Sequence, residues 1–205
     1  NNRSIMPLSL SHPLVALIAF EDTPFGLDGL SINGMLSHFE NPKSRPEFKQ
    51  PQSLAVLSLG EEISAEETHE KLRSYFSEKN NALYLGLFEN RNTYPTPPHP
   101  EPQNGLMLGL TSASSRDDED AFNEWYDTTH AADALKSGFF SEASRYNRLY
   151  PTDDSPRYLA FYSSPHPGPE ALGMLINHYK TNPSPMSPLC RIHHVWTFST
   201  CPVGG

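Results

Sequence analysis

A proline-rich segment divides this chain into two stretches, and it limits the possible folds more than any other feature. The segment begins at residue 95 with PTPPHPEP. Proline fixes φ at about −65° and has no backbone N–H to donate, so this composition predicts a stiff connection rather than a helix or an inner strand. We therefore expect a first unit at residues 1–94, a linker at residues 95–104 and a second unit at residues 105–205.

The second unit shows a regular succession of apolar patterns. Apolar runs of strand length flank two stretches in which apolar residues recur every three or four positions, the spacing of a helix. The predicted order is strand, helix, strand, strand, helix, strand. The strands are residues 106–112, 140–150, 157–163 and 190–200, and the helices are residues 117–137 and 169–180.

The first unit gives nearly the same order. Its predicted strands are residues 14–22, 53–60 and 82–89, and its predicted helices are residues 28–39 and a segment that begins after Ser64. Ser64 and Glu67 form a capping box, which supports the second helix. The spacing of Ile32, Leu36 and Phe39 predicts the first helix, although two glycines weaken it.

A short extended piece at residues 47–49 would complete the order βαββαβ in the first unit as well. The two units would then be copies of one α+β arrangement joined by a stiff linker.

The predicted helix at residues 117–137 has clear boundaries. Four consecutive acidic residues open it, where unpaired N–H groups and the helix dipole favour negative charge. Ser114 or Ser115 is the expected N-terminal cap. Gly138 stands where a helix commonly ends on a residue in the left-handed conformation.

One side of this helix combines aromatic and titratable residues. At spacings of three and four positions, it carries Phe122, Trp125, Tyr126, Thr129, His130, Asp133 and Ala134. A buried histidine or aspartate is costly unless it is hydrogen-bonded, so this stripe suits the wall of a cavity better than ordinary core. The simpler interpretation is that His130 only bonds a strand carbonyl or pairs with Asp133 or Arg145.

These residues resemble the EthD-like branch of the dimeric α+β barrel superfamily. The similarity lies in an acidic helix start, the pattern Phe-x-x-Trp-Tyr-Asp-x-x-His, a Gly-Phe turn, and a strand that ends in Arg-Tyr. Its carriers are Phe122, Trp125, Tyr126, Asp127, His130, Gly138, Phe139, Arg145 and Tyr146. They cover only a small part of the chain.

The resemblance implies ferredoxin-like βαββαβ units whose sheets pair into a barrel. Many members are cofactor-free enzymes or cyclases of secondary metabolism, and others have no known activity. For this chain it implies two tandem ferredoxin-like units packed sheet to sheet as a fused dimeric α+β barrel. Such a chain would be a monomer with an internal pseudo-dimer, or a homodimer. We expect the site in the second unit, because the first offers only His38, interpreted as an exposed residue at a helix end.

The candidate chemistry is proton transfer by His130 and Tyr126. An imidazole with a pKa near neutrality can take up and return protons during enolisation, decarboxylation, cyclisation or dehydration. We assign His130 as the base, Tyr126 as the acid or orienting hydroxyl, Asp133 as the residue that orients the imidazole, and Arg145 as a clamp for a carboxylate or enolate. Arg145 and Tyr146 point to opposite faces of one strand, so only one of them meets the helix.

Further side chains are expected to line the pocket. The substrate-binding candidates are Phe122, Trp125, Tyr146, Tyr162, His194 and Trp196. His194 shares the more apolar face of the last strand with Trp196, whereas His193 points to the other face, so the two histidines do not form a metal pair. We expect no metal. For the aromatic residues the simpler interpretation is packing, since aromatics are good strand formers.

Charge and motifs exclude several classes of function. A net charge of −9 with a pI of about 5.4 argues against nucleic acid and against anionic membranes as partners. No apolar run approaches the roughly 20 residues that a spanning helix needs. The sequence has no P-loop, no G-x-G-x-x-G after a strand, no G-x-S-x-G elbow and no H-E-x-x-H, so we expect no cofactor.

Two cysteines are too few for a disulfide framework and indicate a reducing compartment, which favours the cytoplasm. A single bridge between Cys190 and Cys201 remains open.

The sequence leaves three functional hypotheses, each with a small hydrophobic molecule as partner. The first is a cofactor-independent lyase, cyclase or isomerase that uses His/Tyr acid–base chemistry on an apolar, oxygenated natural-product intermediate of polyketide or terpenoid type. The second is a non-catalytic small-molecule-binding or stress-response barrel, in which the same stripe lines a polar cavity. The third is a cofactor-free monooxygenase.

Overall fold

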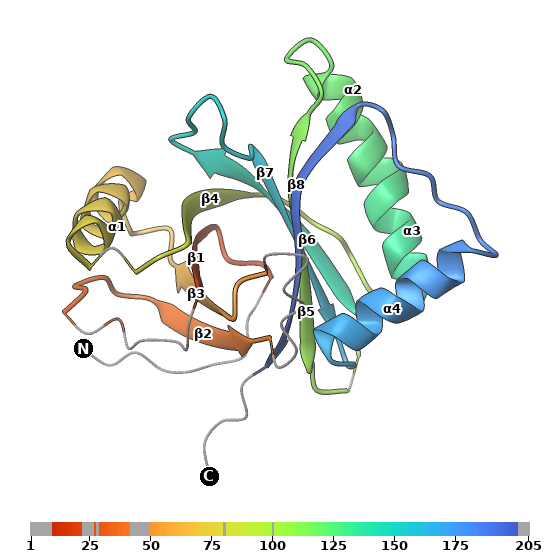
Figure 1. The fold of residues 1–205 in the computed structure, drawn as a ribbon, viewed down its shortest axis with the longest axis horizontal. Helices are drawn as coiled ribbons and strands as arrows, with labels where there is room; N and C mark the ends of the chain where they lie inside the picture. Colours follow the sequence, from red (N-terminus) through yellow and green to blue (C-terminus); the bar gives the residue numbers. More distant parts are fainter. Residues whose placement is uncertain are drawn as a thin grey trace.

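In the part of the chain that the structure describes, eight antiparallel strands close into a barrel with helices packed outside it (Figure 1). The structure is a computed structural model and describes residues 10–21, 27, 29–41, 50–79, 81–99 and 101–200. The strands are β1 (Leu14–Phe20), β2 (Met35–Glu40), β3 (Ser53–Leu59), β4 (Tyr84–Thr93), β5 (Gly105–Ala113), β6 (Glu142–Leu149), β7 (Tyr158–Ser164) and β8 (Cys190–Thr200).

The strands of each half stay together around the barrel. Those before the linker follow the order β4-β1-β3-β2, and those after it follow the corresponding order β8-β5-β7-β6. The halves meet where β4 pairs with β6 and where β2 pairs with β8. Every strand of the barrel therefore has a neighbour on each side, although the β2–β8 junction is short.

The helices lie on opposite sides of the barrel, with α1 on one side and the others on the second (Figure 1). They are α1 (Ala65–Lys79), α2 (Glu119–Trp125), the π-helical turn η2 (Tyr126–His130), α3 (Ala131–Lys136) and α4 (Gly168–Tyr179). Segments α2, η2 and α3 run on as one long helix. No helix of the described residues is both long and apolar enough to cross a membrane.

Three residues predicted to start or end helices lie where such residues are expected, although the helix bounds differ from the predicted ones by one or two residues. The N–H of Glu67 donates to Ser64 Oγ at 3.3 Å, as a capping serine requires. At the start of the long helix, Ser115 Oγ accepts the N–H of Asp118 at 3.3 Å. At its end, Gly138 has a φ of 80°, in the left-handed region that glycine adopts without a steric penalty.

The predicted helix at residues 28–39 is wrong. Strand β2 occupies its second half, with Leu36 in the core outside the barrel and Phe39 in the interior, the alternation of a strand. The segment before β2 places Leu27 and Leu30 on the outer core. These apolar residues cover the sheet where we expected a helix, so burial is achieved without helical structure.

His38 consequently lies in a strand and not at an exposed helix end. Its side chain is half-buried, and its Nε2 is buried without a hydrogen-bond partner. Burial lowers the pKa of this imidazole. The short strand expected at residues 47–49 lies outside the described residues. The described elements thus give the order βαββαβ for the second half only.

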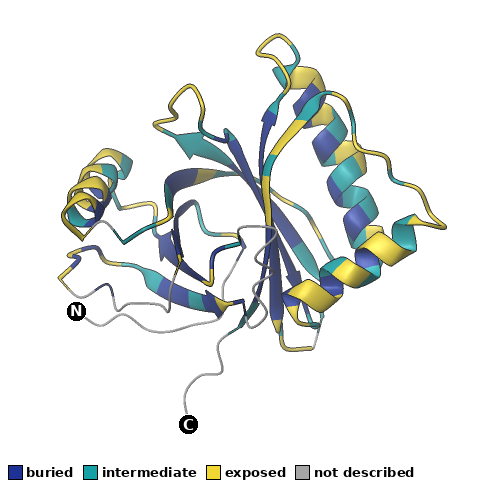
Figure 2. Ribbon diagram, viewed as in Figure 1, coloured by how far each residue is buried: buried dark blue, intermediate teal, exposed yellow. Residues whose placement is uncertain are grey.

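Apolar side chains from both halves fill the interior of the barrel. Leu17, Phe88 and Phe161 are among those with no accessible surface. Burying a side chain of this size contributes roughly 2 kcal/mol. Separate apolar clusters lie outside the barrel, beneath α1 and beneath α2, α3 and α4 (Figure 2). Strand β1 is therefore buried on both faces, which explains its continuous apolar sequence.

Candidate functional site

Tyr126 and His130 lie at the two ends of the π-helical turn in the long helix. The N–H of Ala131 donates to the carbonyl of Tyr126, five residues earlier. Such a turn shifts the phase of the helix face, and π turns are frequent at functional sites. Tyr126 is buried and His130 half-buried, whereas Thr129, which we predicted on the same stripe, is exposed.

Arg145 of β6 lies directly beneath this helix and has no accessible surface. Its Nη1 donates to Asp127 Oδ1 at 2.7 Å, and its Nη2 donates to Asn123 Oδ1 at 2.8 Å. The guanidinium carbon also lies 4.2 Å from the centre of the Tyr126 ring, a favourable position for a cation over an aromatic face. Of the two alternatives on this strand, Arg145 is thus the residue that meets the helix.

Asp127 connects this arginine to the first half of the chain. The hydroxyl of Tyr94 donates to Asp127 Oδ1 at 2.6 Å, and Arg91 Nε lies 3.7 Å from Oδ2. Burial and the neighbouring carboxylate raise the pKa of Tyr94, so this phenol stays protonated. Our sequence prediction missed Asn123 and Tyr94 and gave Asp127 no role. A buried arginine needs hydrogen-bond acceptors, and this need was the only feature that could have indicated such residues.

The hydroxyls of Tyr126 and Tyr162 face each other across the helix–sheet contact. Tyr162 of β7 donates to Tyr126 at 3.3 Å, and both side chains are 2% exposed. Burial raises the pKa of Tyr126 to about 12 and that of Tyr162 well above its ordinary value. Both phenols are therefore neutral hydrogen-bond donors at physiological pH.

His130 stands beside this pair without a hydrogen bond to Nδ1. Its ring stacks on Trp125, with centres 5.0 Å apart, and meets the edge of Tyr126 at 4.8 Å. The Nδ1 atom is buried and unpartnered. Burial lowers the pKa of His130 to about 4; the charge of Asp133 opposes this shift, and that of Arg145 adds to it. The imidazole is therefore neutral at pH 7.

Asp133 acts on His130 through its charge rather than through a hydrogen bond to Nδ1. Its Oδ2 accepts the hydroxyl of Ser184 at 2.8 Å, and its Oδ1 lies 3.7 Å from Lys136 Nζ. Ser184 belongs to the segment between α4 and β8, so this contact holds that segment against the helix.

Three predicted lining residues do not join the cluster. Tyr146 points into the barrel and donates to the carbonyls of Leu10 and His12. Trp196 also lies in the interior, and the exposed His194 stacks on it at 4.9 Å. The physical reason is that the more apolar face of a barrel strand turns inward, away from the covering helices. Phe122, Trp125 and Tyr162 do lie together beneath or within the helix.

The two neighbouring histidines of β8 do not converge on one site. His193 hydrogen-bonds Ser112 at 3.0 Å, and a bulge opposite Leu110 interrupts the strand register beside it. Within the described ranges, no group of three or more histidine, cysteine or acidic side chains could hold a metal ion.

Cys190 is a free thiol at the edge of the cluster and is half-buried. Burial raises its pKa to about 11, so the thiol is protonated and weakly reactive at neutral pH. The alternative of a bridge to Cys201 involves a residue outside the described range.

The cluster is closely packed. Surface cavities of about 450, 340 and 380 Å³ are lined by other residues. His130 is half-buried, and the segment that carries Ser184 is tied to this part of the helix through Asp133.

Comparison with known proteins identifies the fold. No protein-family model matches the sequence, and no curated protein matches it. Two variants of chlorite dismutase from Candidatus Nitrospira defluvii have similar structures. The first gives a TM-score of 0.58 at 9% identity, over 92% of this chain and 91% of that chain. The second gives 0.56 at 9% identity, over 94% and 92%.

A third structure, provisionally described as a chlorite dismutase, gives a TM-score of 0.53 at 9% identity, over 93% of this chain and 95% of that chain. The chain shares the α+β barrel fold of these structures. Identities this low show the fold alone, and a fold hosts many unrelated activities. The function of this barrel must therefore be argued from its own residues.

Proposed function

We propose that this protein is a cofactor-independent lyase, cyclase or isomerase that transfers protons on an apolar, oxygenated small molecule. The observation that supports this most is the neutral imidazole of His130, whose unpartnered Nδ1 lies beside the hydroxyl pair of Tyr126 and Tyr162. The apolar and aromatic surroundings favour a substrate of polyketide or terpenoid type.

In the proposed reaction, the lone pair of His130 takes a proton from a carbon next to a carbonyl group. The electrons of the broken C–H bond move to the carbonyl oxygen, and the Tyr126 hydroxyl donates a hydrogen bond to the resulting enolate. Where a C=C bond is conjugated with the enolate, the imidazolium then returns its proton to the far carbon of that bond, which moves the double bond and completes an isomerisation. In a cyclisation, the enolate carbon instead attacks a second carbonyl, and that oxygen receives the proton.

The low basicity of His130 restricts the substrate. A base with a pKa of about 4 has little driving force against an ordinary ketone. It suits a carbon acid whose C–H lies between two carbonyl groups, because the charge of that enolate is delocalised. We therefore expect a 1,3-dicarbonyl unit within an aromatic or polycyclic molecule.

Arg145 takes a positioning role in this proposal. Both of its terminal nitrogens already donate to Asp127 and Asn123, so it is not free to clamp a substrate carboxylate. Its charge lies close to the Tyr126 ring and holds that side chain in place.

A non-catalytic binding barrel is the second candidate. The pKa values of the two proposed catalytic residues favour it, because that of His130 is about 4 and that of Tyr126 is about 12, both far from neutral pH. Efficient acid–base catalysts usually have a pKa near the working pH. In this case the hydroxyls and the imidazole would only orient an oxygenated ligand.

We further propose that the chain is an EthD-like member of its superfamily, made of two tandem ferredoxin-like units fused into one barrel. The matching strand orders of the two halves support this proposal, as does the pattern from Phe122 to Tyr146. A chain built this way would work in the cytoplasm as a monomer with an internal pseudo-dimer, or as a homodimer.

The test is hydrogen–deuterium exchange at the C–H of a panel of aromatic β-keto esters, followed by NMR in D₂O. We expect the protein to accelerate exchange of at least one ester, His130→Ala to lose about 100-fold of that acceleration, and Tyr126→Phe to lose about 10-fold. Thr129→Ala, on the exposed side of the same turn, is the matched control and should keep full activity.

Acceleration that survives both His130→Ala and Tyr126→Phe would show that the site lies elsewhere. Tight binding without exchange would favour the binding barrel. Turnover that stops when oxygen is removed would favour a cofactor-free monooxygenase.

A further inference from the structure

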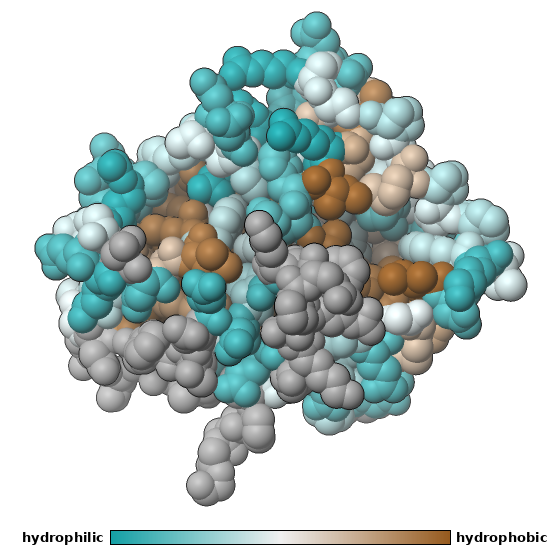
Figure 3. Space-filling model, in the orientation of Figure 1, coloured by the Kyte–Doolittle hydropathy of each residue, from teal (hydrophilic) through white to brown (hydrophobic). Residues whose placement is uncertain are grey.

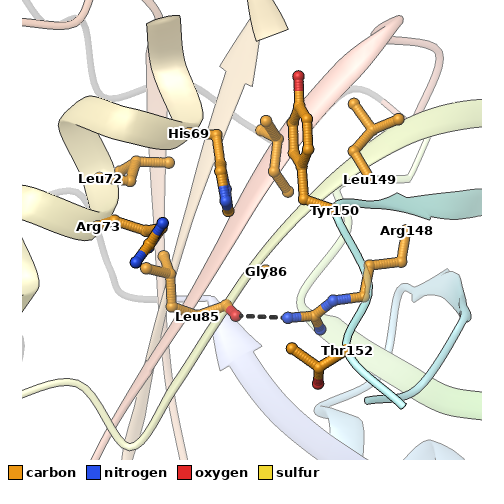
Figure 4. A pocket seen from close by; sticks show the side chains of 10 residues that line it. His69, Leu72, Arg73, Leu85, Gly86, Arg148, Leu149, Tyr150 and Thr152 are labelled. Atoms are coloured by element: carbon orange, nitrogen blue, oxygen red, sulfur yellow. Dashed lines mark hydrogen bonds between the residues drawn. The ribbon is translucent and has the colours of Figure 1, made fainter. Parts of the chain in front are cut away.

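A second pocket lies at the junction of the two halves, far from α2 and α3 in the fold. It has a volume of about 450 Å³ and lies between α1, the start of β4 and the end of β6 (Figure 4). This volume falls in the range of about 300–1,000 Å³ that is common for small-molecule sites. Figure 3 shows hydrophobic residues reaching the surface between α1 and β4, among hydrophilic neighbours.

The walls of this pocket are apolar and partly aromatic. Leu72 of α1, Leu87 of β4 and Leu149 of β6 contribute aliphatic surface. At the rim, the rings of His69 and Tyr150 stack with centres 4.3 Å apart and planes 20° from parallel (Figure 4). A flat ring can therefore lie against a flat surface at the entrance.

Tyr150 is held in an unusual backbone conformation. Its φ is 52°, and it is the one residue other than glycine with a positive φ among those that the structure describes. Backbone strain of this kind persists where the surrounding structure fixes it, and it gathers at binding sites. The 44% exposed ring of Tyr150 lines the pocket and stacks on His69.

The base of the pocket holds a cation without a carboxylate partner. The guanidinium of Arg148 donates to the Tyr84 hydroxyl and, at 3.0 Å, to the carbonyl of Leu85. Its Nε is buried and unpartnered, and none of the described acidic side chains forms an ion pair with it. Arg73, on α1, adds a second positive charge at the mouth.

The position of Arg148 depends on Gly86. A Cβ at residue 86 would lie 3.0 Å from Arg148 Nη1 and 2.6 Å from the Phe88 ring, so a larger residue would displace the guanidinium. The close approach is therefore fixed by the sequence of β4.

We propose that this pocket binds a small aromatic carboxylate. The carboxylate would be attracted by the positive charges of Arg148 and Arg73, while its ring would lie among the leucines and against Tyr150. Both the charge and the ring would contribute to recognition. One or two fused rings fit the volume. This site is independent of the proposed catalytic cluster.

Isothermal titration calorimetry with 1-naphthoate tests the proposal, with 1-naphthamide as an uncharged ligand of the same shape. We expect naphthoate to bind with a Kd in the micromolar to low millimolar range and the amide to bind at least tenfold more weakly. Arg148→Gln should weaken naphthoate binding at least tenfold. Arg73→Gln, whose side chain is 65% exposed, should weaken it about threefold without affecting the fold.

Two further variants keep the result interpretable. Tyr150→Asn removes the ring but keeps a residue that tolerates positive φ, and it should weaken binding of naphthoate and naphthamide alike. His130→Ala should leave naphthoate binding unchanged, which separates this pocket from the first site. In NMR, the amides that shift on titration should lie near Gly86 and Tyr150.

The proposal is overturned if naphthoate does not bind below 10 mM, or if the acid and the amide bind equally well. It is also overturned if a folded Arg148→Gln protein keeps full affinity, or if His130→Ala abolishes binding.

Discussion

Moving a charged group out of water costs free energy, and this cost explains how the residues beneath the long helix are paired. A fully buried arginine costs several kcal/mol unless its donors are paired; Arg145 pairs its two terminal nitrogens with Asp127 and Asn123, whereas its Nε is buried without a partner. The same positive charge adds to the effect of burial on His130 and keeps its imidazole neutral. Burial is the main cause of the low pKa of His130, and the arginine adds to it.

The stability of the protein should fall in acid because of His130. Its pKa is about 4 in the folded state and 6.5 in the unfolded state, so between these values the unfolded chain binds more protons. Stability is therefore lost as the pH falls from 6.5 towards 4, by roughly 2–3 kcal/mol for this group. Urea unfolding across this range should give a shallower pH dependence for His130→Gln than for the wild type.

Two further variants test the cause of this dependence. Asp133→Asn should lower the pKa of His130 further, since the carboxylate opposes the shift, and should steepen the loss of stability in acid. Thr129→Ala is exposed on the same turn and should leave the slope unchanged. Equal slopes for His130→Gln and the wild type would mean that His130 titrates normally.

Helices and strands whose ends or periodicity are marked by nearby residues in the sequence could be predicted. The long helix was located from its acidic start and from Gly138, and the last strand was predicted with the boundaries that the structure has. The π turn was not predictable, because it depends on how Tyr126 and His130 pack on the sheet. The first-half helix failed because Leu36 and Phe39, three positions apart, serve opposite faces of a strand.

Only the candidate-site residues on or next to the long helix could be predicted from the sequence. The helix stripe named Phe122, Tyr126 and His130, and the period of β6 reduced the choice to Arg145 or its neighbour. Tyr94 follows β4 in the first half, and a contact across that distance in sequence leaves no local pattern. Trp196 was misplaced because the apolar face of a strand was taken to face the helices, whereas in a closed barrel it faces the interior.

Replacing Gly138, just after the long helix, and Gly173, within α4, by alanine should change the free energy of unfolding in opposite directions. Gly138 has a φ of 80°, where a Cβ meets no neighbour but strains the backbone, so Gly138→Ala should destabilise by about 1 kcal/mol. Gly173 lies inside α4 with open space around it, so Gly173→Ala should stabilise by roughly 0.5–1 kcal/mol. Urea unfolding of both variants provides the measurement. Changes of the same sign would contradict the helix ends described above.

At the scale of the whole molecule, the barrel is closed by two junctions of unequal length. β4 and β6 are paired from Leu87–Leu149 to Thr93–Ser144, with one irregularity. Among the residues that the structure describes, which exclude 42–49 and 201–205, β2 and β8 are paired at Phe39–Thr200 and Glu40–Ser199. Separating two strands breaks their backbone hydrogen bonds and the apolar packing behind them. The junction with fewer paired residues should therefore open more easily than the longer one.

Amide hydrogen exchange should therefore begin at the β2–β8 junction. Exchange followed by mass spectrometry should show peptides that cover residues 35–40 taking up deuterium before peptides that cover residues 84–93, although both strands belong to the same half. The expected cause is local opening, since β2 keeps its bonds to β3 on one edge but has few on the other. Opening here would admit solvent to the interior next to Phe39 and Phe198, so a cavity-forming change such as Phe39→Ala should speed exchange at this junction more than at the β4–β6 junction. Equal protection of both junctions, or earlier opening between β4 and β6, would show that side-chain packing rather than strand pairing decides where this barrel opens.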